Sequence, residues 1–243
     1  MQPPLIPWDF ILILIVLGTL VPWRGAVRVK HLLGQPVLNV RERLSLYAST
    51  IFYQWLLVAV VAWRAFSRKL SLVELGLTTS DTWRTVLIAV GLTTLLCANQ
   101  WASLRRMTQL PESQRGLLLR VTEKIMPRSF PETLVFAALA CTAGLAEEFL
   151  YRGFVFTVFA HVFAGSAVSI PMAMILSSAW FGVGHLYQGR RGIITTFIVG
   201  LLFSIIRVWS GSLIPSMAAH AGIDLMAGIG ASRYLRPGSV RTD

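Results

Sequence analysis

Residues 130–163 read FPETLVFAALACTAGLAEEFLYRGFVFTVFAHVF, an apolar stretch with two adjacent glutamates, Glu147 and Glu148, and Arg152 in its second half. The apolar parts on either side of the glutamate pair are short for membrane crossings. The stretch is therefore one long or kinked helix, or two elements. Because an ionised carboxylate at the centre of a bilayer costs at least about 2.5 to 3.5 kcal/mol, these acids indicate a functional site.

The composition of the whole chain indicates a polytopic membrane protein. Its 243 residues are 55% hydrophobic with a mean hydropathy of +0.65, and only 14% are charged, against roughly 25% in soluble domains. We predict an all-α bundle of about seven to eight transmembrane helices. The apolar runs that predict them are Trp8 to Trp23, Leu44 to Trp63, Val86 to Leu104, Phe130 to Leu145, Phe149 to Phe163, Gly165 to Gly184, Ile193 to Trp209 and Leu213 to Ile229.

Lysine and arginine predict the orientation, because cytoplasmic loops collect them. Alternate connections carry sixteen on one side and four on the other. We expect a multi-pass protein of the cell (plasma) membrane with its N-terminus outside and its C-terminus in the cytoplasm. The net charge of +11 is then explained by basic loops beside anionic lipid headgroups, and no nucleic acid is expected as a partner.

We expect one membrane domain over residues 1–243. Residues 1–129 hold the N-terminal spans, residues 130–230 the polar motifs, and residues 231–243 a basic cytoplasmic tail. Between the first two parts, a polar connection has apolar residues at helical spacing and predicts a helix lying in the membrane interface. Those residues are Leu117, Leu118, Val121 and Ile125.

Glu147 and Glu148 point about 100° apart on an α-helix, whereas Glu148 and Arg152 share a face. Glu148 can therefore be neutralised by Arg152 while Glu147 stays free in a cavity, as general-base chemistry requires. The alternative is that all three form a buried charge cluster that only fixes helix packing.

Two further polar motifs follow in the chain, Phe181-x-x-x-His185 and His220-x-x-x-Asp224. Phe181 lies one turn before His185 and can wall a site, although a single membrane histidine is also common as a packing residue. His220 and Asp224 share a helix face and can bind a metal, relay a proton or satisfy each other. Glu, His and His from three helical segments predict a shared polar cavity within the membrane.

Three other ionisable residues are predicted to lie outside this site. His31 falls in a basic loop and His161 near the outer end of a span, while Arg207 beside Trp209 fits a side chain that snorkels to the membrane edge.

The order EExxxR, FxxxH, HxxxN/D resembles the CPBP intramembrane proteases, which include the CAAX prenyl endopeptidases and the bacteriocin-processing or Abi proteins. The resemblance covers about residues 130–230. It implies a CPBP-type enzyme with an all-helical membrane fold and a cavity open to membrane and cytosol. It also implies hydrolysis of a peptide bond in a membrane-associated peptide or protein.

By motif position, the resemblance implies that Glu147 activates water and that Glu148, Arg152 and Phe181 are structural partners of the site. His185 would hold the water, while His220 and Asp224 would stabilise the oxyanion. Asp224 departs from the prenyl-protease form, which has Asn there, and an ionised Asp cannot donate a hydrogen bond. It is therefore protonated, orients His220, or favours a bound metal.

A metal site, for a divalent ion such as zinc, is the older interpretation of the family and would use Glu147, His185 and His220. No HExxH motif or cysteine cage is present, so we favour the metal-free mechanism. Two functions of other classes remain as alternatives. A catalytically inactive scaffold would keep its role in Glu147→Gln, and a proton-coupled transporter would show flux.

Overall fold

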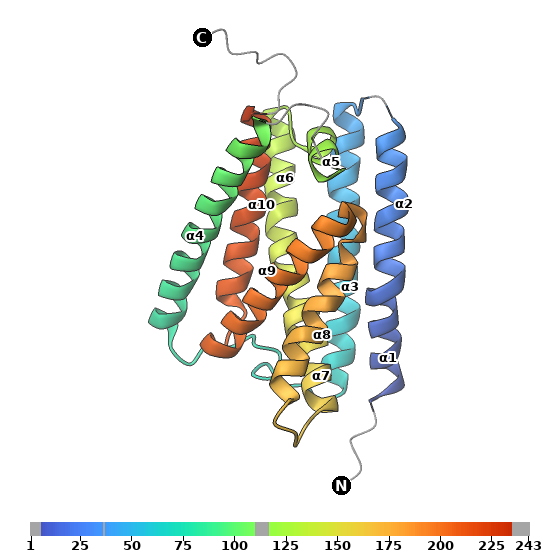
Figure 1. The fold of residues 1–243 in the computed structure, drawn as a ribbon. Coiled ribbons are helices and arrows are strands. Elements are labelled where there is room, and N and C mark those ends of the chain that lie inside the picture. Colours follow the sequence, from blue (N-terminus) through green and yellow to red (C-terminus); the bar gives the residue numbers. More distant parts are fainter. Residues whose placement is uncertain (1–5, 36, 110–116, 235–243) are drawn as a thin grey trace.

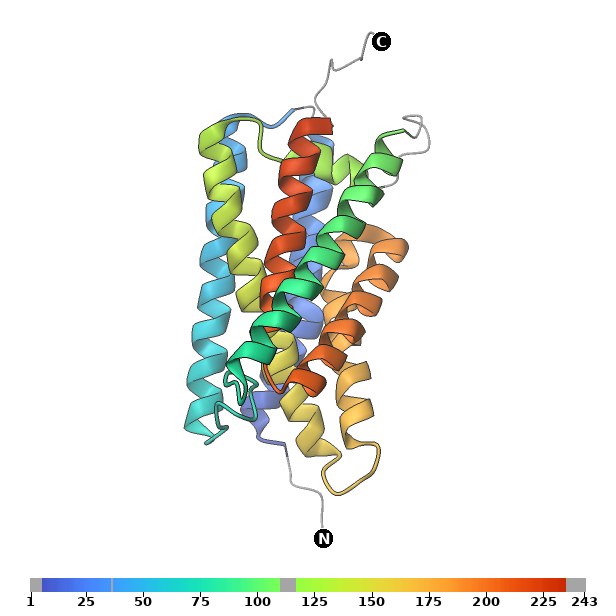
Figure 2. The same cartoon turned by 90° about the vertical axis from the view of Figure 1, so that its left-hand side faces the viewer.

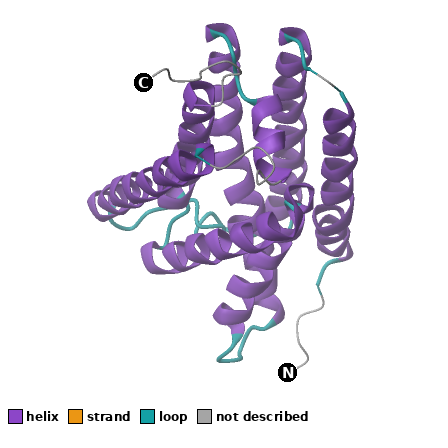
Figure 3. Ribbon diagram, turned by 45° about the horizontal axis from the view of Figure 1, so that its top comes forward, coloured by secondary structure: helices purple, strands orange, loops and turns teal. Residues whose placement is uncertain are grey.

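The computed structural model describes residues 6–35, 37–109 and 117–234. This part of the chain is a bundle of helices and loops without strands (Figure 3). Five of its continuous helices are long and apolar enough to cross a membrane, Trp8–Gly34, Val40–Ser67, Thr82–Arg106, Phe130–Val162 and Leu186–Ser210. The predicted all-α, polytopic fold is confirmed.

The N-terminal part contributes three long helices. The first runs without a break through α1 (Trp8–Ile15), a π-helical turn η1 (Val16–Leu20) and α2 (Val21–Gly34). Then come α3 (Val40–Ser67) and α4 (Thr82–Thr108). A capping box starts α3, in which Asn39 accepts from the amide of Glu42 and the Glu42 carboxylate accepts from the amide of Asn39.

The predicted interfacial segment forms α5 (Leu117–Ile125). It runs across the bundle axis, near the end of the bundle at which α10 (Ile214–Tyr234) ends (Figures 1 and 2). Lys124 of α5 donates to the carbonyls of Leu32, Leu33 and Gln35 at the end of α2. A positive charge at a helix C-terminus is stabilising. The side chain of Leu118 and residues 110–116 and 235–243, including most of the predicted tail, lie outside the described residues.

The motif-bearing part has four helical segments. The first is continuous over Phe130–Val162, as α6 (Phe130–Glu147), a π-helical segment η3 (Glu148–Val155) and α7 (Phe156–Val162). Residues 130–162 thus form one helix rather than two elements. The others are α8 (Ser169–Gly184), α9 (Gly189–Ser210), which follows the short turn η4 (Leu186–Gln188), and α10 (Ile214–Tyr234).

In the packing of these helices, α10 lies between α4 and α6, while α8 packs against α7 and α9 (Figures 1 and 2). α6 and α10 approach each other closely at Gly144, where an added Cβ would lie 2.7 Å from the backbone nitrogen of Ala221. This contact requires glycine. It brings the end of α6 beside the part of α10 that carries the polar motif.

α6 begins and α10 ends at the same end of the bundle, and the connection between α8 and α9 stops short of that end (Figures 1 and 2). The connection lies nearer the middle of the bundle. His185, at the end of α8, is therefore at about the same level along the bundle axis as Glu147 and Glu148. Large apolar side chains such as Phe52, Trp63 and Leu95 face outward, as lipid contact requires.

Candidate active site

The glutamate pair lies where the helix widens. Glu147 is the last residue of α6 and Glu148 the first of the π-helical segment η3. A π-helical turn has one extra residue per turn, and such turns are frequent at functional sites. The sequence left open one long or kinked helix or two elements, and it did not predict a π-helical segment. All eight residues of η3 are buried.

Glu148 and Arg152 form an ion pair with no solvent access. Arg152 Nη1 lies 2.9 Å from Glu148 Oε1, and both side chains are 0% exposed. His220 Nδ1 lies 2.9 Å from the same oxygen. The guanidinium also stacks on the ring of Phe181, 3.9 Å from its centroid. This network ties η3 to α8 and α10, and it holds the His220 ring with its other nitrogen, Nε2, turned away from Glu148.

Glu147 has a different environment from its neighbour. Its Oε1 accepts a hydrogen bond from Gln54 Nε2 of α3 at 2.8 Å. Its Oε2 is buried and has no hydrogen-bond partner within the described ranges. That oxygen lies 3.8 Å from His185 Nε2 and 3.9 Å from His220 Nε2. Glu147 is thus a carboxylate with one oxygen held and one oxygen facing two imidazoles.

His185 is oriented by its own helix. Its Nδ1 lies 2.9 Å from the carbonyl oxygen of Phe181. A carbonyl can only accept, so Nδ1 carries the proton and a neutral His185 presents Nε2 as an acceptor. The Phe181 ring lies 4.6 Å from His185 and 5.9 Å from His220, centroid to centroid, so Phe181 packs between the two histidines as a wall of the site.

Asp224 lies on the more open side of the group. Its Oδ2 is 3.9 Å from His220 Nε2, and 39% of its side chain is exposed. The seven predicted site residues therefore lie in one cluster, which α6, η3, α8 and α10 build together. Their chemical roles stay predictions.

A zinc ion was one predicted occupant. A tetrahedral ion with bonds of about 2.0 to 2.1 Å needs ligand atoms roughly 3.3 to 3.4 Å apart. The distances from Glu147 Oε2 to the two Nε2 atoms, 3.8 and 3.9 Å, are longer. Within the described residues, no group of three or more His, Cys, Asp or Glu side chains is arranged to hold a metal ion. As they lie, these side chains do not fit zinc, although both imidazoles turn Nε2 inward as metal ligands do.

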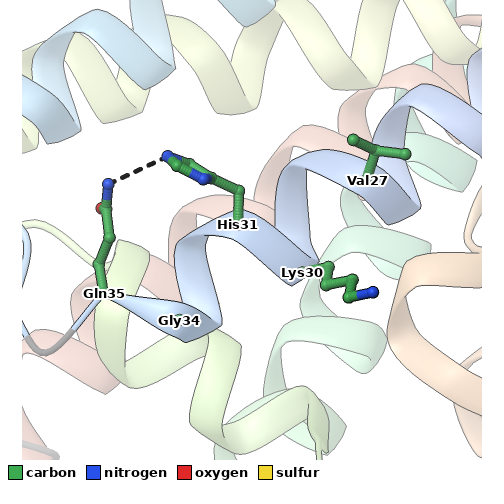
Figure 4. A pocket seen from close by; sticks show the side chains of 5 residues that line it. All are labelled: Val27, Lys30, His31, Gly34 and Gln35. Atoms are coloured by element: carbon green, nitrogen blue, oxygen red, sulfur yellow. Dashed lines mark hydrogen bonds between the residues drawn. The ribbon is translucent and has the colours of Figure 1, made fainter.

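The residues expected outside the site do lie outside it, but the prediction that His31 falls in a loop is wrong, because His31 lies in the last turn of helix α2. His31 lines a pocket of about 470 Å³ on α2 together with Val27, Lys30, Gly34 and Gln35, and its Nε2 is 3.2 Å from Gln35 Nε2 (Figure 4). His161 Nε2 pairs with Glu74 Oε1 at 3.0 Å. This pocket contains none of the motif residues.

The snorkelling interpretation of Arg207 is wrong. Arg207 is only 8% exposed, and it donates to the carbonyl of Glu74 at 2.5 Å and to Thr157 Oγ1 at 3.2 Å. It also stacks on Phe156, 3.8 Å from the ring centroid. Arg207 therefore fastens the loop after α3 to α7 and α9 from inside the bundle.

Sequence reasoning missed Gln54. The signal was present, because Gln54 is the one strongly polar side chain in the centre of the apolar run from Leu44 to Trp63. A polar residue at membrane depth usually faces a partner in the bundle. The sequence could not say which partner, since nothing in it aligns α3 with α6.

The arrangement supports general-base chemistry. Glu147 Oε2 has no partner of its own, and a water molecule in hydrogen-bond reach of it, at about 2.6 to 3.2 Å, would also be within reach of an imidazole Nε2. The second glutamate is neutralised by Arg152 and serves to hold His220.

Comparison with known proteins covers the motif-bearing part. Residues 129–226 match the family model described as Rce1-like, Type II CAAX prenyl endopeptidase. No curated protein and no solved structure matches the chain. The matched segment contains all seven predicted site residues, and the match supports assignment of this membrane protein to the CPBP/CAAX protease family, a family of intramembrane proteases.

Proposed function

We propose that the protein is an intramembrane endopeptidase that hydrolyses a peptide bond in a membrane-associated peptide or protein by means of a Glu147-activated water. One observation carries this proposal: Glu147 Oε2 is buried, lacks a hydrogen-bond partner among the described residues, and faces two imidazole nitrogens. The match to a CAAX-type family supports the reaction class.

In the first step, water is held and deprotonated. Neutral His185 accepts one hydrogen of the water at Nε2, because its Nδ1–H is committed to the carbonyl of Phe181. Glu147 Oε2 takes the other proton as general base. The water oxygen then attacks the carbonyl carbon of the scissile bond and forms a tetrahedral intermediate.

In the second step, the oxyanion is stabilised and the intermediate breaks down. His220 in its doubly protonated form donates Nδ1–H to Glu148 and Nε2–H to the oxyanion. A donor of this kind contributes about 3 to 4 kcal/mol in other hydrolases. Glu147 returns its proton to the leaving nitrogen, the C–N bond breaks, and a carboxylic acid and an amine are released.

Asp224 serves His220 rather than the oxyanion in this proposal. An ionised Asp accepts hydrogen bonds only, and its Oδ2 lies 3.9 Å from His220 Nε2. We assign to Asp224 the role of orienting His220 and stabilising its charged form. An Asn at this position could instead donate directly to the oxyanion.

For the protein in the cell, we propose insertion in the plasma membrane with the N-terminus outside and the C-terminus in the cytoplasm. The first described helix, α1, begins at one end of the bundle, and α10 ends at the opposite end (Figure 1). Basic residues at the start of α3 (Arg41 and Arg43) and at the end of α4 (Arg105 and Arg106) lie at the end of the bundle at which α10 ends, which supports this orientation. A substrate would then reach Glu147 from the membrane on the cytoplasmic side.

The test is cleavage of a membrane-tethered peptide library by purified protein in lipid, for wild type and Glu147→Ala, with and without a chelator. Products from wild type that disappear in Glu147→Ala and persist with chelator support the proposed mechanism. Activity that is lost in Glu147→Ala and is also lost when wild type is treated with the chelator indicates a metal-dependent mechanism. No cleavage by wild type, together with a folded Glu147→Ala that keeps its cellular role, indicates a scaffold instead.

A further inference from the structure

The N-terminal part of the chain, outside the segment matched to the protease family, contributes a side chain to the site. Gln54 lies on α3 and donates from Nε2 to Glu147 Oε1 at 2.8 Å. Residues 129–226, which match the family, do not include it. The contact joins positions 93 residues apart in the sequence.

The register between α3 and α6 is fixed at two other levels, so this contact does not depend on a single pair of side chains. Arg43 forms a bidentate ion pair with Glu132, with both nitrogen–oxygen distances at 2.9 Å and both side chains buried. Trp55 Nε1 donates to Thr142 Oγ1 at 3.2 Å. Buried bidentate pairs have strict geometry, and they hold Gln54 at the height of Glu147.

The Gln54 amide is committed to this one contact. Only its NH₂ group can donate to a carboxylate, so the amide must present nitrogen to Glu147. Its Oε1 is then left buried without a hydrogen-bond partner in the described part of the chain. An unpaired buried acceptor is unfavourable, a cost that general packing does not explain.

The contact also decides which carboxylate oxygen is free. With Oε1 held by Gln54, Oε2 is the oxygen that faces His185 and His220. Without the donor, the carboxylate can rotate about its last bond, and neither oxygen is held towards the water position.

We propose that Gln54 is a positioning residue for the reaction, which holds Glu147 so that Oε2 points at the water between the histidines. The proposal rests on the function proposed above. Residues that orient a reacting group typically change activity by about 10- to 100-fold when they are removed.

The test compares Gln54→Met, which keeps nearly the same volume without the amide, with Thr142→Val. Thr142→Val removes the neighbouring hydrogen bond between α3 and α6 and leaves Glu147 untouched. We expect kcat to fall about 10- to 100-fold in Gln54→Met with KM within about twofold of wild type, and kcat to be unchanged in Thr142→Val. Wild-type kcat in Gln54→Met overturns the proposal, and so does an equal loss in both variants.

A second measurement is independent of peptidase activity. Dicyclohexylcarbodiimide modifies protonated carboxyl groups at membrane depth, and mass spectrometry gives its rate at Glu147. We expect this rate to rise several-fold in Gln54→Met, where Oε1 of Glu147 has lost its donor and the carboxyl group is free to react, and to stay at the wild-type value in Thr142→Val.

The two measurements separate the two proposals. If wild type cleaves no peptide while Gln54→Met alone labels faster, the positioning contact stands and the proposed function fails. If wild type cleaves peptides and neither kcat nor labelling responds to Gln54→Met, the positioning role fails and the function stands.

Discussion

Removing Arg152 should destabilise the protein more than any ordinary surface change, because it leaves Glu148 as a buried charge. Both side chains are 0% exposed, and Arg152 Nη1 lies 2.9 Å from Glu148 Oε1. Without Arg152, the only donor left to Glu148 in the described structure is His220 Nδ1. Breaking a buried pair in this way costs about 3 to 5 kcal/mol.

We therefore expect Arg152→Met to lower the free energy of unfolding by about 3 to 5 kcal/mol. Removing both charges, in Glu148→Leu with Arg152→Met, should cost less than Arg152→Met alone, since no charge is then stranded. The exposed Arg41 is the matched control, and Arg41→Met should stay within about 0.5 kcal/mol of wild type.

The assay is equilibrium unfolding in mixed detergent micelles, with the free energy of unfolding measured for wild type, both single variants and the double variant. The reasoning is refuted if Arg152→Met lies within about 1 kcal/mol of wild type. It is also refuted if the double variant costs more than Arg152→Met.

Two more predictions concern helix packing and pH. Gly144→Ala places a Cβ 2.7 Å from the nitrogen of Ala221 and should destabilise the protein by about 1 to 3 kcal/mol in the same assay; Gly91→Ala, where nothing lies within 4 Å, should not. Hydrogen bonds from Ser71 lower the pKa of Glu74 below its ordinary 4.5, so its stabilising contribution is present above that pH and is lost as the pH falls through the lower, folded-state pKa. Melting temperatures of wild type and Glu74→Gln should accordingly differ at neutral pH and converge as the pH is lowered from 4.5 through the folded-state pKa of Glu74, and a difference that stays constant on acidification would contradict the assignment.

The sequence was sufficient for the fold class because hydropathy alone separates membrane helices from soluble ones. It was also sufficient to predict that Glu147, His185 and His220 lie close together. Charged and polar groups in apolar helices have few stable places other than beside each other. The ion pair between Glu148 and Arg152 could be predicted from their spacing in the sequence, since residues four apart share a helix face.

The rest depended on contacts between helices that a single sequence does not encode locally. The π-helical segment after Glu147 is set by inward packing of a whole eight-residue stretch. Gln54 meets Glu147 because two other contacts, Arg43 with Glu132 and Trp55 with Thr142, fix the register of α3 against α6. Arg207 looked like a residue of the membrane edge, but the loop that holds Glu74 folds back onto it.

The most direct test of Glu147 as general base is the single-turnover cleavage rate of a reconstituted wild-type protein against Glu147→Gln, on the first peptide that wild type is found to cleave. Gln keeps the size and the hydrogen-bonding shape of the side chain but cannot take a proton from water. We predict that the rate falls by about 10²- to 10⁴-fold, while substrate binding and the free energy of unfolding stay near wild type. Cleavage by Glu147→Gln at the wild-type rate would contradict the account.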